Sequence, residues 1–202
     1  MRLSRTCFLL WDIGSFPQNL GVQLLTLLSK MASKVLYRVC YGSPNPEPWQ
    51  SRMLTIKPAI LHDFRRHKVR YCDYPAIIPQ ANSNVRGTFV TGLTEGDICR
   101  LDLFEGREYT RSKVKVRVLA KVGDDSGKGN IEGEEVEAET YVWTSEENDL
   151  EHGEWDFGEF VREKLAWWAG TNDEYKEVDE AMRPWLGDST GGSGTGGNIN
   201  GV

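Results

Sequence analysis

Long hydrophobic runs are absent from this sequence of 202 residues. No window reaches the roughly 18 uninterrupted apolar residues that a membrane-spanning helix needs. The apolar run at 7–11 ends at Asp12 and is shorter than the roughly 7–15 residues of a signal-peptide core. We therefore expect a cytoplasmic protein with no membrane partner.

Residues that hold metals or bind nucleic acid are also scarce. The four cysteines include no C-x-x-C pair and there are three histidines, whereas a structural zinc site needs about four clustered Cys or His ligands. Scattered cysteines of this kind are typical of reduced thiols. The net charge is −6, with the acidic excess in the second half, whereas nucleic-acid binders usually carry a basic stripe. We expect no metal and no nucleic-acid partner.

Motifs for nucleotide cofactors and for nucleophilic catalysis are missing as well. The Gly-Lys-Gly at 127–129 lacks the eight-residue phosphate-loop pattern. The sequence has no G-x-S-x-G turn and no zinc-protease helix motif.

Aromatic residues, by contrast, are plentiful, with seven Trp, seven Tyr and seven Phe. Such a composition excludes disorder along the whole chain. The length suits one domain of about 150 residues with extensions. From residue 187 onward a Gly- and Ser-rich stretch offers nothing large to bury before Ile199, and we expect a flexible tail at 187–202.

Alternation of apolar and polar residues predicts several strands. The runs at 114–119 and 136–143 alternate with period two, and the polar, Gly-rich stretch 123–135 separates them. They predict a long hairpin. Further strands are expected at 59–64, 69–71 and 85–90.

Helices are expected after and between these strands. Thr94 is a candidate N-cap, and Asp97 adds an acidic first turn, for a short helix over 94–103. Apolar residues with helical spacing predict one helix over 157–168 and a second over 175–185. Strands first and helices last indicate an α+β fold, with a small mixed or antiparallel, barrel-like sheet and flanking helices.

An acidic segment stands out as a candidate for chemistry. Residues 101–111 read LDLFEGREYTR, with Asp102 and Glu105 one turn apart where a helix ends at Gly106. Phe104 could wall a pocket, and desolvation there would raise the pKa of a neighbouring carboxyl. On spacing alone, a solvated acidic helix end remains the alternative.

The same segment resembles the LD-x-[FY]-E-G-x-x-Y-x-R signature of the γ-glutamyl cyclotransferase-like family, in its avirulence-induced-gene-like branch. Three further stretches resemble motifs of that family in the same order. They are YPAIIP at 74–79, VRGTFVTGL at 85–93 and AETYVW at 138–143. The resemblance covers about residues 32–168 and implies the fold of that family.

The resemblance also implies an activity. Such enzymes close the α-amine of a γ-glutamyl compound onto its γ-carbonyl, which releases 5-oxoproline and an amine. Glu105 would be the general acid/base, and no metal or cofactor would be needed. The residues implied to bind the small γ-glutamyl substrate are Tyr74, Gly87, Tyr109, Arg111 and Tyr141. Each tyrosine could instead belong to the core, Arg111 could instead pair with a carboxylate, and Asp102 is expected to cap or to form a salt bridge.

The N-terminus departs from the family. Its members open with a strand and a Tyr-Gly-Thr/Ser-Leu loop that grips the substrate, which by position would fall at 27–30, where this chain reads Leu-Leu-Ser-Lys. A similar Tyr41-Gly42-Ser43-Pro44 lies too close to Glu105. We therefore expect an atypical extension at 1–30 and the family domain at 31–186. The motif around Glu105 favours an active cyclotransferase, the lost loop favours a binding module, and the leaving group and oligomeric state stay open.

Overall fold

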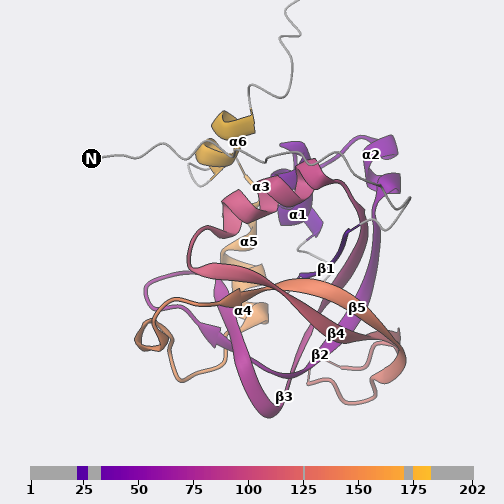
Figure 1. Cartoon of the computed structure of the whole chain (residues 1–202), viewed down its shortest axis with the longest axis vertical. Helices are drawn as coiled ribbons and strands as arrows, with labels where there is room; N and C mark the ends of the chain where they lie inside the picture. The colour runs from indigo at the N-terminus through magenta and orange to yellow at the C-terminus, as the bar shows by residue number, and fades with distance from the viewer. Residues whose placement is uncertain (1–21, 27–32, 125, 171–174, 183–202) are drawn as a thin grey trace, which may run out of the picture.

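The computed structural model describes residues 22–26, 33–124, 126–170 and 175–182. Its strands form a closed barrel in the order β1-β3-β2-β4-β5, with helices gathered at one end and along one side (Figure 1). The α+β, barrel-like fold expected from the sequence is confirmed. Within the described residues, no helix combines the length and apolarity required to span a bilayer.

Two long antiparallel strands make one side of the barrel. β2 (Thr55–Lys68) pairs with β3 (Pro75–Leu93), and the register shifts between His62 and Phe64. Asp63 and Asn82 both have a positive φ there, and the Asn82 N–H donates to the Asp63 carboxylate at 3.1 Å. Asp and Asn tolerate this left-handed conformation better than most residues, and such irregularities bend strands enough to close a barrel.

Three strand predictions in this region need correction. Residues 75–79 and 85–93 of two of the motifs lie on the single strand β3, and Tyr74 directly precedes it. The strand expected at 69–71 is wrong, because Val69 forms only an isolated bridge to Leu150 and Tyr71 turns with a positive φ of 60°. The strand expected to start at 59 begins earlier, at Thr55, because Thr55 already pairs with Thr91 of β3.

The predicted long hairpin is confirmed. β4 (Tyr109–Lys121) pairs antiparallel with β5 (Ile131–Trp143), and the Gly-rich segment joins them. β2 contacts β4 through Ala59 and Ile60, which ties the two hairpins together.

A short strand closes the barrel. β1 (Val22–Thr26) runs antiparallel to β3 and parallel to β5. The sheet therefore begins inside the range 1–30 that was expected to lie outside the domain. The rest of that range, the loop position 27–30 and the tail at 187–202 lie outside the described residues.

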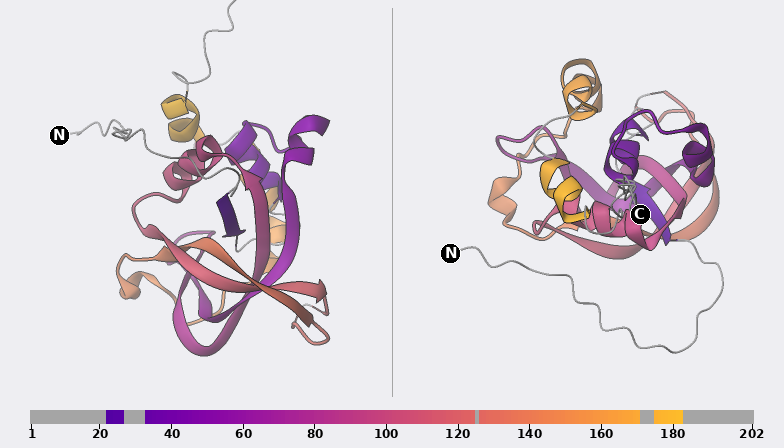
Figure 2. Two further views of the ribbon diagram at one scale, coloured as in Figure 1. Left: turned by 45° about the vertical axis from the view of Figure 1, so that its right-hand side comes forward. Right: turned by 90° about the horizontal axis from the view of Figure 1, so that it is seen from above.

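Helices cover one open end of the barrel, where α1 (Ser33–Tyr41), α2 (Pro48–Met53) and α3 (Glu95–Glu105) lie together (Figures 1 and 2). After the short turn η1 (Glu147–Asp149), the helix predicted over 157–168 is interrupted at Lys164 into α4 (Phe157–Glu163) and α5 (Leu165–Trp168). The last predicted helix corresponds to α6 (Lys176–Met182).

Two main apolar clusters form the core. One fills the barrel and includes Leu61, Ile77, Phe89 and Val116. The other lies between the barrel end and the helices, and its buried members include aromatic residues from β5 and the C-terminal helices. The second cluster therefore joins the C-terminal helices to the end of the barrel that α3 covers.

Candidate functional site

The two ends of α3 place Glu105. At the start, the Thr94 hydroxyl accepts the Asp97 N–H at 3.2 Å, and the Asp97 carboxylate accepts the Thr94 N–H at 2.9 Å. This reciprocal pair is a capping box, and it confirms Thr94 as the expected N-cap. At the other end, Gly106 has a φ of +78°, which ends the helix directly after Glu105.

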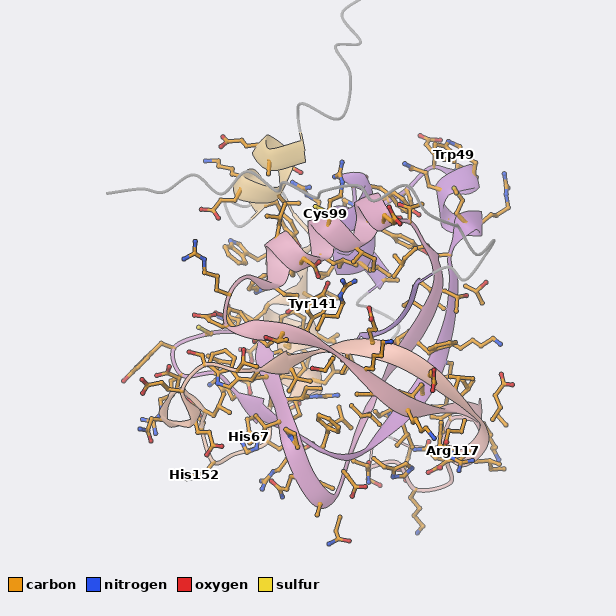
Figure 3. All side chains as sticks on the ribbon, in the orientation of Figure 1. Trp49, His67, Cys99, Arg117, Tyr141 and His152 are labelled. Atoms are coloured by element: carbon orange, nitrogen blue, oxygen red, sulfur yellow. The ribbon has the colours of Figure 1, made fainter. Side chains whose placement is uncertain are left out.

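The beginning of β4 and the end of β5 face the last turns of α3. Arg111 pairs across the sheet with Tyr141, and Tyr109 pairs with Trp143. Because side chains alternate along a strand, these residues and Glu139 lie on one face of the hairpin. Figure 3 shows the labelled Tyr141 side chain between this hairpin and α3.

A hydrogen-bonded network joins that face to α3. The Tyr141 hydroxyl donates to Asp102 Oδ1 at 2.7 Å. Arg111 Nε lies 3.7 Å from the same oxygen, and Arg111 Nη1 lies 3.3 Å from Glu139 Oε2. Asp102 thus forms the expected salt bridge, and the guanidinium of Arg111 lies between two carboxylates.

Glu105 is the half-buried carboxyl next to this network. Burial, and to a lesser extent the nearby charge of Asp102, together raise the pKa of Glu105 from 4.5 to about 7. A carboxyl group with a pKa near neutrality can both take up and release a proton at physiological pH. Glu105 is thus half-buried, whereas Asp102 at the same helix end is exposed.

Two tyrosines flank this glutamate. Burial raises the pKa of Tyr109 and of Tyr141, and the charge of Glu105 acts on both phenols. The Tyr109 hydroxyl donates to the Pro75 carbonyl at 3.1 Å, so its hydroxyl is already hydrogen-bonded within the fold. Tyr74 lies near Tyr109. Its ring meets Trp168 edge-on, with 6.2 Å between the ring centroids.

The structure brings Tyr109, Arg111 and Tyr141 together around Asp102 and Glu105, with Tyr74 beside Tyr109. Gly87 lies elsewhere, buried in β3 opposite Ala59. Its neighbour Thr88 pairs with Thr26, the last residue of β1.

The carboxyl end of β1 points toward the same region of the barrel. Leu24 lies beside Glu139 in the parallel strand β5, so the carboxyl ends of the two strands run in the same direction. The expected position of the substrate loop at 27–30 directly follows this strand end. Tyr41 closes α1 instead, so the similar stretch Tyr41-Gly42 does not follow a strand.

Sequence reasoning missed three residues of this region. Glu139 forms an ion pair with Arg111, and its place opposite a basic residue in the predicted hairpin could have revealed it. Trp168 and Tyr175 both contact the ring of Phe104, the residue before Glu105. Their apolar spacing predicted helices, but nothing local in the sequence shows where those helices pack.

Candidate metal ligands do not gather in the part of the chain that the structure describes. The labelled side chains of His67 and His152 lie at the end of the barrel away from α3 (Figure 3). His62 pairs with Glu132 at 3.0 Å. Cys40, Cys72 and Cys99 are free thiols, as the sequence predicts, and Cys7 lies outside the described residues.

Residues 38–157, more than half of the chain, match the family described as gamma-glutamyl cyclotransferase, AIG2-like. Protein AIG2 C of Arabidopsis thaliana is 31% identical over 136 residues, which are 62% of this chain and 74% of that protein. AIG2-like protein B of the same plant is 37% identical over 112 residues, or 55% of this chain and 59% of that protein. Protein AIG2 B is 34% identical over 105 residues, so the match spans 52% of this chain and 56% of that relative.

Several solved structures are similar to this chain. A solution structure of an Arabidopsis thaliana protein is 24% identical, with 95% of this chain and 99% of that chain covered and a TM-score of 0.47. A structure of a gamma-glutamyl cyclotransferase is 15% identical, with 65% of this chain and 69% of that chain covered and a TM-score of 0.41.

Proposed function

The chain belongs to the AIG2-like gamma-glutamyl cyclotransferase family, and we propose that it releases 5-oxoproline from a γ-glutamyl amine or peptide with Glu105 as general acid/base. The observation that carries this proposal is the half-buried carboxyl of Glu105, held at the end of α3 against Tyr109 and Tyr141 with a pKa near 7.

The reaction needs one group that moves protons in both directions. Ionised Glu105 takes a proton from the substrate's α-ammonium, because the protonated amine has no lone pair. The freed nitrogen attacks the γ-carbonyl carbon and forms the new C–N bond of a five-membered lactam. The old bond to the leaving nitrogen breaks as protonated Glu105 gives that nitrogen a proton. The ring nitrogen releases its second proton, and the expelled amine takes up a proton to leave as an ammonium ion. General acid/base catalysis of this kind typically contributes about 10²–10⁴-fold.

The remaining task is to hold the substrate bent, so that its amine and its γ-carbonyl meet. Orientation of this kind removes much of the entropic barrier to ring closure. We propose that Tyr74, Tyr109 and Tyr141 line the site and that Arg111, fixed by two carboxylates, keeps Tyr141 and Asp102 in place.

A binding module without turnover is the second candidate, and the sequence at 27–30 favours it. Leu27-Leu28-Ser29-Lys30 stands where family members carry Tyr-Gly-Thr-Leu. A chain with Glu105 in place and a changed substrate loop could hold a γ-glutamyl ligand and fail to turn it over.

The test measures 5-oxoproline release by the full chain. The panel contains γ-glutamyl amino acids, glutathione and γ-glutamyl-ε-lysine. Glu105→Gln keeps the shape of the side chain and removes the titrating group. Glu95→Gln is the matched control, because it makes the same change at an exposed position in the first turn of the same helix.

The proposal predicts release by the wild-type and Glu95→Gln proteins, and a loss of at least about 100-fold in Glu105→Gln. Equal rates in all three proteins would refute the role of Glu105. No release by any of them would favour the binding module, and the same assay after Tyr-Gly-Thr-Leu is introduced at 27–30 would show whether the loop is the cause.

A further inference from the structure

The C-terminal helices reach back over the end of α3 that carries Glu105. α6 lies alongside α3 in both Figure 1 and the left view of Figure 2. These helices lie beyond residues 38–157, which match the family. Their contacts therefore add a feature to the site that the family match does not include.

An ion pair attaches α6 to the first helix. The buried Arg38 of α1 donates two hydrogen bonds to Asp179 of α6, from Nη1 at 3.2 Å and from Nη2 at 2.8 Å. The guanidinium carbon of Arg38 also lies 4.3 Å from the centroid of the Tyr175 ring. Bidentate pairs of this kind fix geometry as well as adding energy, and a guanidinium over a ring adds a further attraction.

Tyr175 links this ion pair to Phe104, the residue before Glu105. Its ring stacks on the ring of Phe104, with centroids 5.5 Å apart and planes within 11°. Trp168 meets the same Phe104 ring edge-on at 6.2 Å, and the Tyr175 hydroxyl donates to the Trp168 carbonyl. Phe104 is thus held by two aromatic rings that the C-terminal segment supplies.

The end of α3 needs such support for an electrostatic reason. A helix carries partial negative charge at its C-terminus, which repels an ionised carboxylate in the last turn. Gly106 follows at once and contributes no side chain that could pack against the barrel and hold this turn in place. Without an external restraint, the ionised side chain of Glu105 would gain by turning out into water.

We propose that Tyr175 is a positioning residue for Glu105, because its ring holds Phe104 and thereby keeps the last turn of α3 against Tyr109 and Tyr141. This inference rests on the proposed function for its catalytic meaning. In structural terms, Tyr175, which directly precedes α6, fixes the position of the Glu105 carboxyl by stacking on Phe104.

The proposal is tested by NMR on the full chain labelled with ¹³C-glutamate. The chemical shift of the Glu105 carboxyl carbon, followed against pH, gives the pKa of that carboxyl. Glu105→Gln identifies the signal. The charged and titrating groups around the carboxyl are Asp102, Tyr109, Tyr141 and, through Asp102, Arg111. The variants of Tyr175 leave all of them in place.

Tyr175→Ala should lower the pKa of Glu105 by about one pH unit or more toward the ordinary value near 4.3. Tyr175→Phe retains the ring and should keep the wild-type titration. If the chain turns over substrate, Tyr175→Ala should shift the acid limb of the pH profile by the same amount, with a loss of roughly 10- to 100-fold in kcat and little change in KM.

Trp155→Leu is the matched control for a general loss of packing. Trp155 is buried in the C-terminal segment, where its ring meets Phe157 and Phe160 and its N–H donates to the Asp73 carbonyl at 2.8 Å. This variant should destabilise the protein and leave the titration of Glu105 unchanged.

A wild-type titration in folded Tyr175→Ala would overturn the proposal, as would an equal shift in Trp155→Leu. Where Tyr175→Ala does not fold, Phe104→Leu removes the same stack from its other side while keeping apolar volume, and an unchanged titration there would overturn the proposal equally. The titration needs no turnover, so a chain that releases no 5-oxoproline would refute the proposed function and leave the positioning role to be decided by NMR.

Discussion

Replacement of Glu105 by Gln should stabilise the protein at high pH. A pKa raised from 4.5 to about 7 means that the folded protein holds this proton more tightly than the unfolded chain does. The contribution of the group to stability is therefore complete at low pH and is lost as the pH rises toward and through 7. If Glu105 were fully buried, a pKa shift of this size would lower the free energy of unfolding at high pH by about 3 kcal/mol. Because the side chain is partly exposed, we expect a loss of about 1–3 kcal/mol.

Urea denaturation of the wild-type protein and Glu105→Gln at pH 4.5 and pH 8.5 measures this effect. The free energies of unfolding should agree within about 0.5 kcal/mol at the lower pH, and the variant should be more stable by about 1–3 kcal/mol at the higher pH. Glu95→Gln is the control for loss of a carboxylate that is not buried. A variant that is equally or less stable than wild type at pH 8.5 would refute the claim that the site desolvates this carboxyl.

Two further substitutions test the surroundings of the site. Tyr141→Phe removes the donor 2.7 Å from Asp102 and should lower the free energy of unfolding by about 1–2 kcal/mol in urea denaturation, whereas no loss would show that the bond to Asp102 is not made in solution. Thr94→Ala removes the cap of α3 and should lower the same quantity by about 1 kcal/mol, and an unchanged midpoint would contradict the capping box.

Local chemistry in the sequence predicts much of what holds the site. The Thr94 and Asp97 spacing predicts the start of α3, and the alternation at 114–119 and 136–143 predicts the hairpin that faces it. These elements depend on neighbouring residues and on simple periodicity, so a single sequence is sufficient to find them. The candidate glutamate follows from the motif around it, and its raised pKa agrees with the expected desolvation.

Features that depend on distant contacts are not predictable in the same way. Residues 75–79 and 85–93 belong to one long strand, and its irregular part, where the Asn82 N–H donates to Asp63 of β2, depends on a residue 19 positions away. Arg38 meets Asp179 from a position 141 residues away, and no local pattern indicates that pairing. The stack of Tyr175 on Phe104 depends on that long-range return of the chain, which is why the sequence reveals the glutamate and not its support.

The pH dependence of 5-oxoproline release by the full chain tests the central claim most directly. If Glu105 is the acid/base, kcat/KM should rise with pH along a limb with an apparent pKa near 7, where the carboxyl becomes ionised, and this limb should vanish with the activity in Glu105→Gln. Release by Glu105→Gln at the wild-type rate, with the same limb, would contradict the account.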